Sequence, residues 1–465
     1  DVPASTIMTI YNAERFGLSA LHQLRGRVGR GSKQSYCFLI SNSTTENSKQ
    51  RLSIMEETED GFRIAEEDLK LRNSGEIFGL RQSGFSDLKF IDIIYDVKTI
   101  KLVRDECIKY LKENYGNPSS LYDFGYSVSK DINSCREVIA KYINCKAEEV
   151  FFNSCATEGN NTAIFGAVST AKGKNIVSTE IEHSSVFNVY KFLKEKKEIR
   201  FLKLDEFGYI DIESVKNLVD ENTEIVSIAY VHNELGIIQD VESIGKAIKE
   251  KNKKCIFHVD SAQAFGKVDI DVKKSKIDIL TLSGHKIHAQ KGIGAIYVNK
   301  NINLRPFVLG GGQEKDFRSG TENVAGIMGL KVATEFMYEN MENRKKYLEN
   351  LRDLLISGIS KIENHKFLTT KDGVPNIVTV AFENIRSEVL LHFLESEKIY
   401  ISTGSACSKG KKSRTFDGIG LDNKYNDGVV RISLSEFNTE EEIKIFIEKL
   451  EKYVNEIRMI MKRGR

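Results

Sequence analysis

From residue 115 onward, short β-rich runs alternate with stretches of helical periodicity. The β-rich runs occupy residues 150–153, 175–178, 225–231, 255–259, 277–282 and 294–298. Because parallel neighbours need a long connection, this alternation is typical of a mainly parallel sheet with crossover helices. We therefore predict an α/β fold with a large sheet domain over residues 115–330. A long helical stretch over 332–363 and an amphipathic pattern near 440–461 predict a small α+β domain over 331–465.

Two of these runs end in residues that suit one cofactor. Ser283-Gly284-His285-Lys286 directly follows an apolar run, and Asp260 ends the run before it. A lysine and a carboxylate at successive strand ends suit pyridoxal phosphate (PLP). The lysine forms a Schiff base with the aldehyde, and the carboxylate keeps the pyridine nitrogen protonated so that the ring acts as an electron sink. A lone lysine after a strand is more often a solvated surface charge, so the pair carries the argument.

Three further runs also end in polar residues. Ala156 and Thr157 open a helical pattern, and the first N–H groups of a helix can hold a phosphate, although a plain helix cap explains them about as well. His183 offers an imidazole that can stack on a flat ring, but a single histidine is more often structural. Asn233 offers an amide to a phenolic oxygen. Each signal is weak alone, and their order along the chain is informative.

Together with motifs nearer the C-terminus, these strand ends resemble the cysteine desulfurases of the NifS/IscS type, in class V of the fold-type I PLP-dependent transferases. The resemblance spans residues 115–450. The added motifs are Gly310-Gly311-Gly312-Gln313-Glu314, Arg318-Ser319-Gly320-Thr321-Glu322-Asn323, Val374-Pro375-Asn376, Ser402-Thr403-Gly404-Ser405-Ala406-Cys407 and Arg431-Ile432-Ser433-Leu434. The resemblance implies conversion of L-cysteine to L-alanine, with a persulfide formed on Cys407. That sulfur would serve iron–sulfur cluster assembly or tRNA thiolation, through an acceptor protein.

The resemblance also assigns roles to residues of this sequence. Lys286 would carry the cofactor, Asp260 would pair with its pyridine nitrogen, and His183 would stack on the ring and assist proton transfer. The expected phosphate ligands are Ala156, Thr157, Ser283, His285 and, from the other subunit of a homodimer, Thr321. The expected contacts to the phenolic oxygen and the substrate are Gln263, Asn233, Asn376 and Arg431.

Cys407 separates a desulfurase from an aminotransferase of the same class. It lies in a Gly/Ser/Lys-rich stretch over residues 404–414, which predicts a loop. A thiolate that attacks the substrate sulfur and then carries it outward needs such a tether. An incidental surface cysteine is the alternative, and the surrounding motif argues against it. The other cysteines are interpreted as structural: Cys37, Cys107, Cys135, Cys145, Cys155 and Cys255.

Residues 1–97 read as part of a different protein. The Arg- and Gly-rich segment over 20–31 resembles motif VI of superfamily 2 helicases, in which Arg27 and Arg30 would be the arginine-finger positions. Guanidinium groups bind phosphate oxygens in pairs, although a basic surface loop is the alternative interpretation. Residues 68–84 resemble the C-terminal signature of the RecG branched-DNA helicases. We expect a truncated helicase C-terminal lobe over 1–97, joined to the rest by a helical seam over 98–114.

The sequence contains no GxxxxGK[ST] phosphate loop and no DExH-type box. Without a phosphate cradle the arginines have no γ-phosphate to stabilise, so DNA contact without ATPase activity is expected of this part. A further hypothesis is a non-functional fusion or fragment. It rests on the lack of an N-terminal Asn-Ala-Ala-Thr-Thr-type segment and on Ser435-Glu436-Phe437, where the family has Gly-Arg-Phe.

Composition sets outer limits on these interpretations. A length of 465 residues suits two or three domains, and a net charge of +2 argues neither for nor against nucleic acid as a partner. Seven cysteines without regular spacing predict no disulfide framework and no metal site, which points to a reducing compartment. We find no signal peptide and no run of about 18 apolar residues. We therefore expect a cytoplasmic protein without a membrane part.

Overall fold

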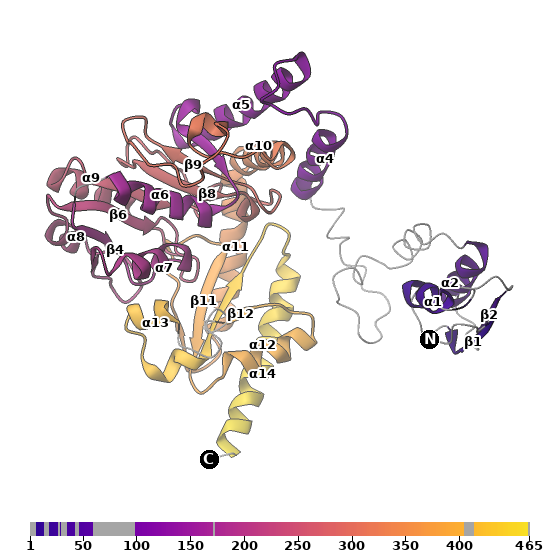
Figure 1. The fold of residues 1–465 in the computed structure, drawn as a ribbon. Helices are drawn as coiled ribbons and strands as arrows, with labels where there is room; N and C mark the ends of the chain where they lie inside the picture. The colour runs from indigo at the N-terminus through magenta and orange to yellow at the C-terminus, as the bar shows by residue number, and fades with distance from the viewer. Residues whose placement is uncertain are drawn as a thin grey trace. The chain divides into compact units, whose positions relative to one another are not determined.

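The computed structural model describes residues 6–13, 18–26, 28, 35–41, 46–58, 98–170, 173–403 and 413–463. The chain divides into two compact units, residues 1–96 and 97–465, which are described separately below (Figure 1). Three predicted site residues, Arg27, Arg30 and Cys407, lie outside the described residues.

The search for membrane spans over the described residues finds no helix with the length and apolar character to cross a membrane.

The N-terminal unit contains a two-stranded parallel sheet, β1 (Ile7–Tyr11) and β2 (Tyr36–Ile40). Helices α1 (Leu18–Arg25) and α2 (Glu46–Glu57) pack against it through a small core. The Arg25 guanidinium donates from Nη1 to the carbonyl oxygens of Met55 at 2.6 Å and Thr58 at 3.0 Å. This arginine therefore ties the end of α1 to the end of α2.

The larger unit is built on a seven-stranded sheet with the strand order β3-β9-β8-β7-β6-β4-β5. Its strands are β3 (Val150–Asn153), β4 (Asn175–Ser178), β5 (Glu198–Phe201), β6 (Thr223–Ala229), β7 (Ile256–Asp260), β8 (Ile279–Ser283) and β9 (Gly294–Val298). Strands β4 to β8 are mutually parallel, and β9 runs antiparallel to both β8 and β3. Six strands therefore end at the same edge. The prediction of an α/β fold with a mainly parallel sheet is confirmed.

Helices cover both faces of this sheet (Figure 1). One face packs against α6 (Ala156–Thr170) and α7 (Ser184–Leu193). The other packs against α5 (Asp123–Ile143), α8 (Ile212–Leu218), α9 (Val241–Lys251) and α10 (Val324–Glu339). Every residue of β7, β8 and β9 is buried, as expected of strands enclosed on both faces, and this explains their unbroken apolar runs.

The helix over the expected seam, α4 (Lys98–Lys112), packs against α10. Val103 is buried there, and the Cys107 thiol donates to the carbonyl oxygen of Ala325 at 3.3 Å. The Tyr110 hydroxyl donates to Asp131 of α5 at 2.7 Å. These contacts make α4 part of the larger unit.

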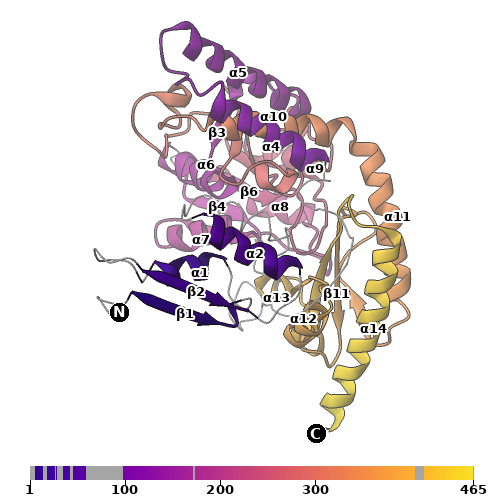
Figure 2. The same cartoon turned by 90° about the vertical axis from the view of Figure 1, so that its right-hand side faces the viewer.

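The C-terminal part of this unit contains a second, antiparallel sheet. Its order is β10-β11-β13-β12, formed by His365–Phe367, Ile377–Phe382, Val429–Ser433 and Ser402–Thr403. Helices α11 (Met341–Ile359), α12 (Ser387–Ser396) and α14 (Glu440–Arg463) share a core with it, and Figure 2 shows α11 and α14 side by side. The expected helical stretch over 332–363 is divided at Asn340, which separates α10 from α11.

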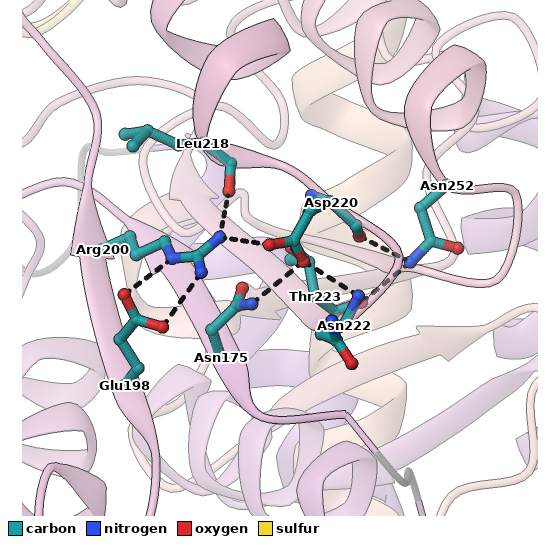
Figure 3. Close-up of polar contacts among 8 residues, drawn as sticks. All are labelled: Asn175, Glu198, Arg200, Leu218, Asp220, Asn222, Thr223 and Asn252. Atoms are coloured by element: carbon teal, nitrogen blue, oxygen red, sulfur yellow. Dashed lines mark hydrogen bonds and ion pairs between the residues drawn. The ribbon is translucent and has the colours of Figure 1, made fainter.

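The amino ends of β4, β5 and β6 are joined by a closed polar network (Figure 3). Arg200 donates to both carboxylate oxygens of Glu198 at 2.9 Å and to Asp220 at 2.7 Å. The other oxygen of Asp220 accepts from Asn175 Nδ2 at 3.1 Å, and Asn252 donates to the carbonyl oxygens of Asp220 and Thr223. Charged groups at this edge therefore have partners within the protein.

Candidate active site

The predicted site residues of the sheet domain follow the carboxyl ends of its strands. Ala156 and Thr157 follow β3, His183 follows β4, Asn233 follows β6, Asp260 ends β7 and is followed by Gln263, and Ser283, His285 and Lys286 lie at the end of β8. Since these strands run in one direction, the structure brings all of these residues to one edge of the sheet.

Asp260 is a buried carboxylate that pairs across the sheet with Thr281 of β8. Its oxygens accept from the backbone N–H of Ala262 at 2.9 Å and from Asn160 Nδ2 at 2.7 Å. Burial raises the pKa of Asp260, and these two N–H donors oppose the shift. A buried carboxylate held by neutral donors is suited to accept a cationic N–H, which would restore its ionised form.

Lys286 lies in the short 3-10 helix Gly284–Ile287 that follows β8. Burial, and then the positive charge of Arg431, lower the pKa of Lys286, while the charge of Asp260 opposes the shift. A larger neutral fraction makes the amine a better nucleophile toward a carbonyl carbon. Next to it, the Ser283 hydroxyl lies 2.8 Å from Nδ1 of His285.

The first turn of α6 supplies a second polar element at the same edge. Gly159 in that turn lets α6 approach the sheet, since a Cβ there would lie 2.9 Å from Thr281 and from the amide of Asn153. The first N–H groups of a helix lack intrahelical partners and favour an anion. Strand β9 lies between β3 and β8. Thr157 comes after β3 and Ser283 ends β8, so the two residues belong to strand ends that are separated by one strand.

Arg431 on β13 connects the small sheet to this edge. It donates to the carbonyl oxygen of Asn233 at 3.0 Å and to the Ser402 hydroxyl at 3.1 Å. Its Nε is buried and has no hydrogen-bond partner among the described residues. A guanidinium with an open N–H suits a carboxylate ligand. Asn376 and Lys286 together line a cavity of ≈ 110 Å³, whose wall also includes Lys267 and Arg344.

The described residues on either side of 404–412, the stretch with Cys407, contact groups at this edge. Before it, Ser402 accepts from Arg431. After it, the Ser413 hydroxyl donates to Glu234 at 3.0 Å. The Arg414 guanidinium donates to the carbonyl oxygen of Glu182 at 2.9 Å and stacks on Phe187, 3.5 Å from the ring centre.

Thr321 differs from the other predicted phosphate ligands in its position. It is exposed, and it lines a separate cavity of ≈ 200 Å³ together with Asn153 and Arg318. The prediction that it acts on a second subunit is compatible with this exposed position and stays a prediction.

Several residues of the site were missed in the sequence. Asn160, Ser185 and Thr281 form hydrogen bonds with Asp260 or with one another, and Lys267 donates to Gln263 at 2.9 Å. Burial, and then the charge of Lys286, lower the pKa of Lys267 to about 8. Burial also raises the pKa of Glu182, the residue before His183, to about 8. Of these residues, Lys267 is the one that the sequence could have indicated, because side chains four residues apart, as Gln263 and Lys267 are, often lie close together.

A pyridoxal phosphate fits this set of groups. Asp260 offers a buried acceptor for a cationic ring nitrogen, Lys286 offers an amine of lowered pKa, and the first turn of α6 offers N–H groups for a phosphate. His183 borders a cavity of ≈ 420 Å³ beside Thr157, which leaves space before its ring. Among the described residues, no cluster of ligands for a metal ion is present.

Two family models match the chain. Residues 98–446 match the model described as aminotransferase class-V. Residues 58–133 match the C-terminal part of domain 3 of the ATP-dependent DNA helicase RecG, so the two matches overlap over 98–133. The class V match starts earlier than the resemblance over 115–450, and it includes α4.

Individual relatives agree with the class V match. The chain is 40% identical to the cysteine desulfurase IscS of Clostridium botulinum (strain Hall) over 365 residues, which are 77% of this chain and 91% of that protein. It is 37% identical to the cysteine desulfurase IscS of Methanosarcina thermophila, over 77% of this chain and 90% of that protein. A solved NifS-like protein superposes with a TM-score of 0.72 at 35% identity, covering 76% of this chain and 95% of the other.

Proposed function

The chain belongs to the aminotransferase class V family, and to the cysteine desulfurases within it, and from this premise we propose that it removes sulfur from L-cysteine with PLP as cofactor and releases L-alanine. The observation that carries the proposal is the meeting of Asp260 and Lys286 at the ends of the neighbouring parallel strands β7 and β8. A carboxylate and an amine in this arrangement hold the two ends of a pyridine aldehyde.

The cofactor, when bound, supplies an electron sink for the electron pair released at the substrate Cα. Asp260 holds the proton of the ring nitrogen, and Lys286 holds the cofactor covalently. The phosphate is bound by Ala156, Thr157, Ser283 and His285. The phenolic oxygen is bound by Gln263 and Asn233. Lys267 supports this arrangement, because its ammonium donates to Gln263 Oε1 and thereby leaves the NH₂ group of Gln263 for the phenolic oxygen.

The substrate carboxylate is bound by Arg431 and Asn376. The unpartnered Nε of Arg431 provides the N–H for this contact, while its two other nitrogens stay bonded to Asn233 and Ser402. His183 borders the adjoining cavity and assists proton transfer to or from the substrate.

The sulfur leaves on Cys407. Its thiolate attacks the substrate sulfur, so an S–S bond forms while the Cβ–S bond of the substrate breaks. The electron pair of the broken bond stays with the substrate carbon, which takes up a proton and leaves as L-alanine, so no external oxidant is required. Cys407 is four residues from Thr403, which allows a reach of roughly 13 Å from that anchor.

The proposal extends to partners. The persulfide passes to an acceptor protein that serves iron–sulfur cluster assembly or tRNA thiolation, and the enzyme acts as a homodimer in which Thr321 contacts the phosphate of the second subunit. The helicase match over 58–133 supports DNA as a partner of the N-terminal unit.

The test is alanine release from L-cysteine by the full-length chain reconstituted with PLP, together with persulfide detection. Cys407→Ala should retain the visible absorbance of the covalently bound cofactor and lose the protein persulfide. Cys145→Ala is the matched control and should retain both. Absence of bound cofactor and of alanine release from the wild-type chain would refute the proposal. A Cys407→Ala chain that still forms a persulfide would refute the assignment of the nucleophile.

A further inference from the structure

A chain of buried polar side chains links Asp260 to His183. Asn160 of α6 lies between them, and its Nδ2 donates to Asp260 Oδ2 at 2.7 Å and to Ser185 Oγ at 2.9 Å. Ser185 Oγ lies 2.8 Å from Nδ1 of His183. On the other side, Thr281 Oγ1 donates to Asn160 Oδ1 at 2.5 Å. Asn160 and Thr281 have no exposed surface, so water does not compete for these groups.

The neighbours of Asn160 fix the direction of its amide. An asparagine side chain has two donors on nitrogen and an acceptor on oxygen. The reverse orientation would place Oδ1 against the carboxylate of Asp260 and would leave the Thr281 hydroxyl facing an NH₂ group. In the favoured orientation both hydrogens of Nδ2 are used, one by Asp260 and the other by Ser185.

The direction of this amide and the backbone N–H of Ser185 together favour one proton position on His183. Because Ser185 Oγ accepts from Asn160, its own hydrogen is free to point at Nδ1 of His183. The backbone N–H of Ser185 also donates to Nδ1, at 3.1 Å. A nitrogen that accepts two hydrogen bonds cannot carry the proton of a neutral imidazole. The proton therefore resides on Nε2 of this exposed side chain, which borders the cavity beside Thr157.

We propose that Asn160 and Ser185 are positioning residues that hold His183 in its Nε2–H tautomer, with Thr281 setting the direction of the chain. His183 then presents an N–H group, not a lone pair, to whatever binds in the adjoining cavity. In the reaction of the proposed function, which identifies the substrate, this N–H is a donor to the sulfur or carboxylate of L-cysteine. The tautomer itself follows from the hydrogen-bond chain and is independent of the substrate.

The test reads the tautomer directly. The full-length chain is labelled with ¹⁵N-histidine, and long-range ¹H–¹⁵N correlations are recorded at about pH 8.5, above the usual range of histidine titration. The His183 signals are assigned by their loss in His183→Gln. We expect a protonated Nε2 and an unprotonated Nδ1. Ser185→Ala removes one of the two donors to Nδ1, and Thr281→Val removes one of the two groups that direct the Asn160 amide, so each should move the Nδ1 resonance part of the way toward its protonated position. Ser184→Ala is the control and should leave the spectrum unchanged, because the Ser184 side chain is not part of the hydrogen-bond chain.

A protonated Nδ1 in the wild-type chain would overturn the inference, and so would unchanged His183 signals in both variants. If Ser185→Ala fails to fold, Thr281→Val decides alone, since it keeps the branched shape of the buried side chain. A kinetic measurement adds a second readout: kcat for alanine release should fall about 10-fold in Ser185→Ala while the KM for L-cysteine is unchanged. A chain without desulfurase activity would refute the proposed function and leave the tautomer assignment to the spectra.

Discussion

The amino and carboxyl edges of the seven-stranded sheet both contain lysines and carboxylates, but the two edges differ in whether these groups form ion pairs. At the amino edge, Arg200 forms hydrogen bonds with Asp220 and Glu198 (Figure 3). Lys197 lies 2.5 Å from Glu224. Lys249 pairs there with Asp278, whose carboxylate also accepts from the backbone N–H of Phe257. Arg200, Lys197 and Lys249 each have an anion within hydrogen-bond distance.

At the carboxyl edge, Glu158 pairs with Arg318, but no ion pair joins Asp260, Glu182, Lys267 or Lys286 to another described residue. Lys286 and Lys267 both have lowered pKa values, and Asp260 and Glu182 both have raised ones, with burial as the largest cause in each case. One oxygen of Glu182 is buried without a hydrogen bond.

The difference separates structural from functional charge. A closed network satisfies its own members and holds three strands together. Burial also raises the pKa values of the paired carboxylates Glu224 and Asp278, so the difference between the edges is the lack of an ion-pair partner, which suits a ligand that balances the charge. Matched substitutions at the two edges can therefore test the distinction.

The largest expected effect is at Lys286. Lys286→Ala should lose alanine release and the visible absorbance of bound cofactor completely, because no other residue attaches the cofactor. Lys249→Ala at the amino edge should retain both and lower the free energy of unfolding by about 3 kcal/mol, since it leaves Asp278 buried without its cation. Absorbance spectra and thermal melts measure the two effects. Loss of activity in a folded Lys249→Ala chain would contradict the division between the edges.

A smaller contrast is expected between two buried aspartates. Asp260→Asn should reduce kcat at least about 100-fold, because the cofactor ring loses the anion that keeps its nitrogen protonated. The variant should remain folded, since a neutral amide avoids the cost of burying a charge, which is what raises the pKa of Asp260. Asp278→Asn should have the reverse pattern, with lower stability and unchanged kcat, because Lys249 loses its partner. Equal kcat values for Asp260→Asn and the wild type would remove Asp260 from the site.

The sheet was predictable from the sequence because its strands are buried on both faces and read as unbroken apolar runs. The expected runs 225–231 and 277–282 lie within about two residues of β6 and β8. Strand β5 was missed, since its sequence Glu-Ile-Arg-Phe is half polar and it lies at the sheet's border. The break at Asn340 was also missed, because helical periodicity continues across it.

The site was predictable only where chemistry follows a strand end. Asp260, Lys286 and His183 each stand within about five residues of the end of a β-rich run, and the structure places them at one edge. Asn160, Ser185 and Thr281 carry no such signal, because they are neutral polar residues within a helix or strand. Their hydrogen bonds arise from the packing of α6 against β8, which the sequence does not specify. The catalytic and binding roles assigned to these residues stay predictions.

Glu182 at the carboxyl edge and Asp220 at the amino edge should also respond oppositely to pH, and Glu182 gives the larger response. Its pKa is about 8 in the folded chain, against about 4.3 when unfolded. Its contribution is therefore fully present below about pH 4.3 and is lost by up to about 1.4 kcal/mol per pH unit as the pH rises toward 8. The side chain of Glu182→Gln does not titrate, so the melting temperature of this variant should rise relative to that of the wild type as the pH increases from about 4.3 to about 8. A constant difference in melting temperature between the wild type and Glu182→Gln from about pH 5 to pH 8 would contradict the raised pKa of Glu182.

The smallest effect is expected at Asp220, and its sign is reversed. The Arg200 guanidinium lowers the pKa of Asp220 to about 2 in the folded chain, below its unfolded value of about 3.9. The stabilisation is present above about pH 3.9 and is lost as the pH falls through 2. Because 40% of this side chain is exposed, solvent screening limits the effect to under about 1 kcal/mol.

Asp220→Asn should therefore melt slightly below the wild type at about pH 6 and approach it near pH 2. Arg200 keeps its bonds to Glu198 and to the carbonyl oxygen of Leu218 in this variant, so the network is weakened but not opened. Melting temperatures of both Asp220→Asn and Glu182→Gln, taken over the same pH series, give the comparison directly. If both differences grew in the same direction with pH, the pKa shift of Glu182 or that of Asp220 would have the wrong sign, and the contrast between these two carboxylates would be lost.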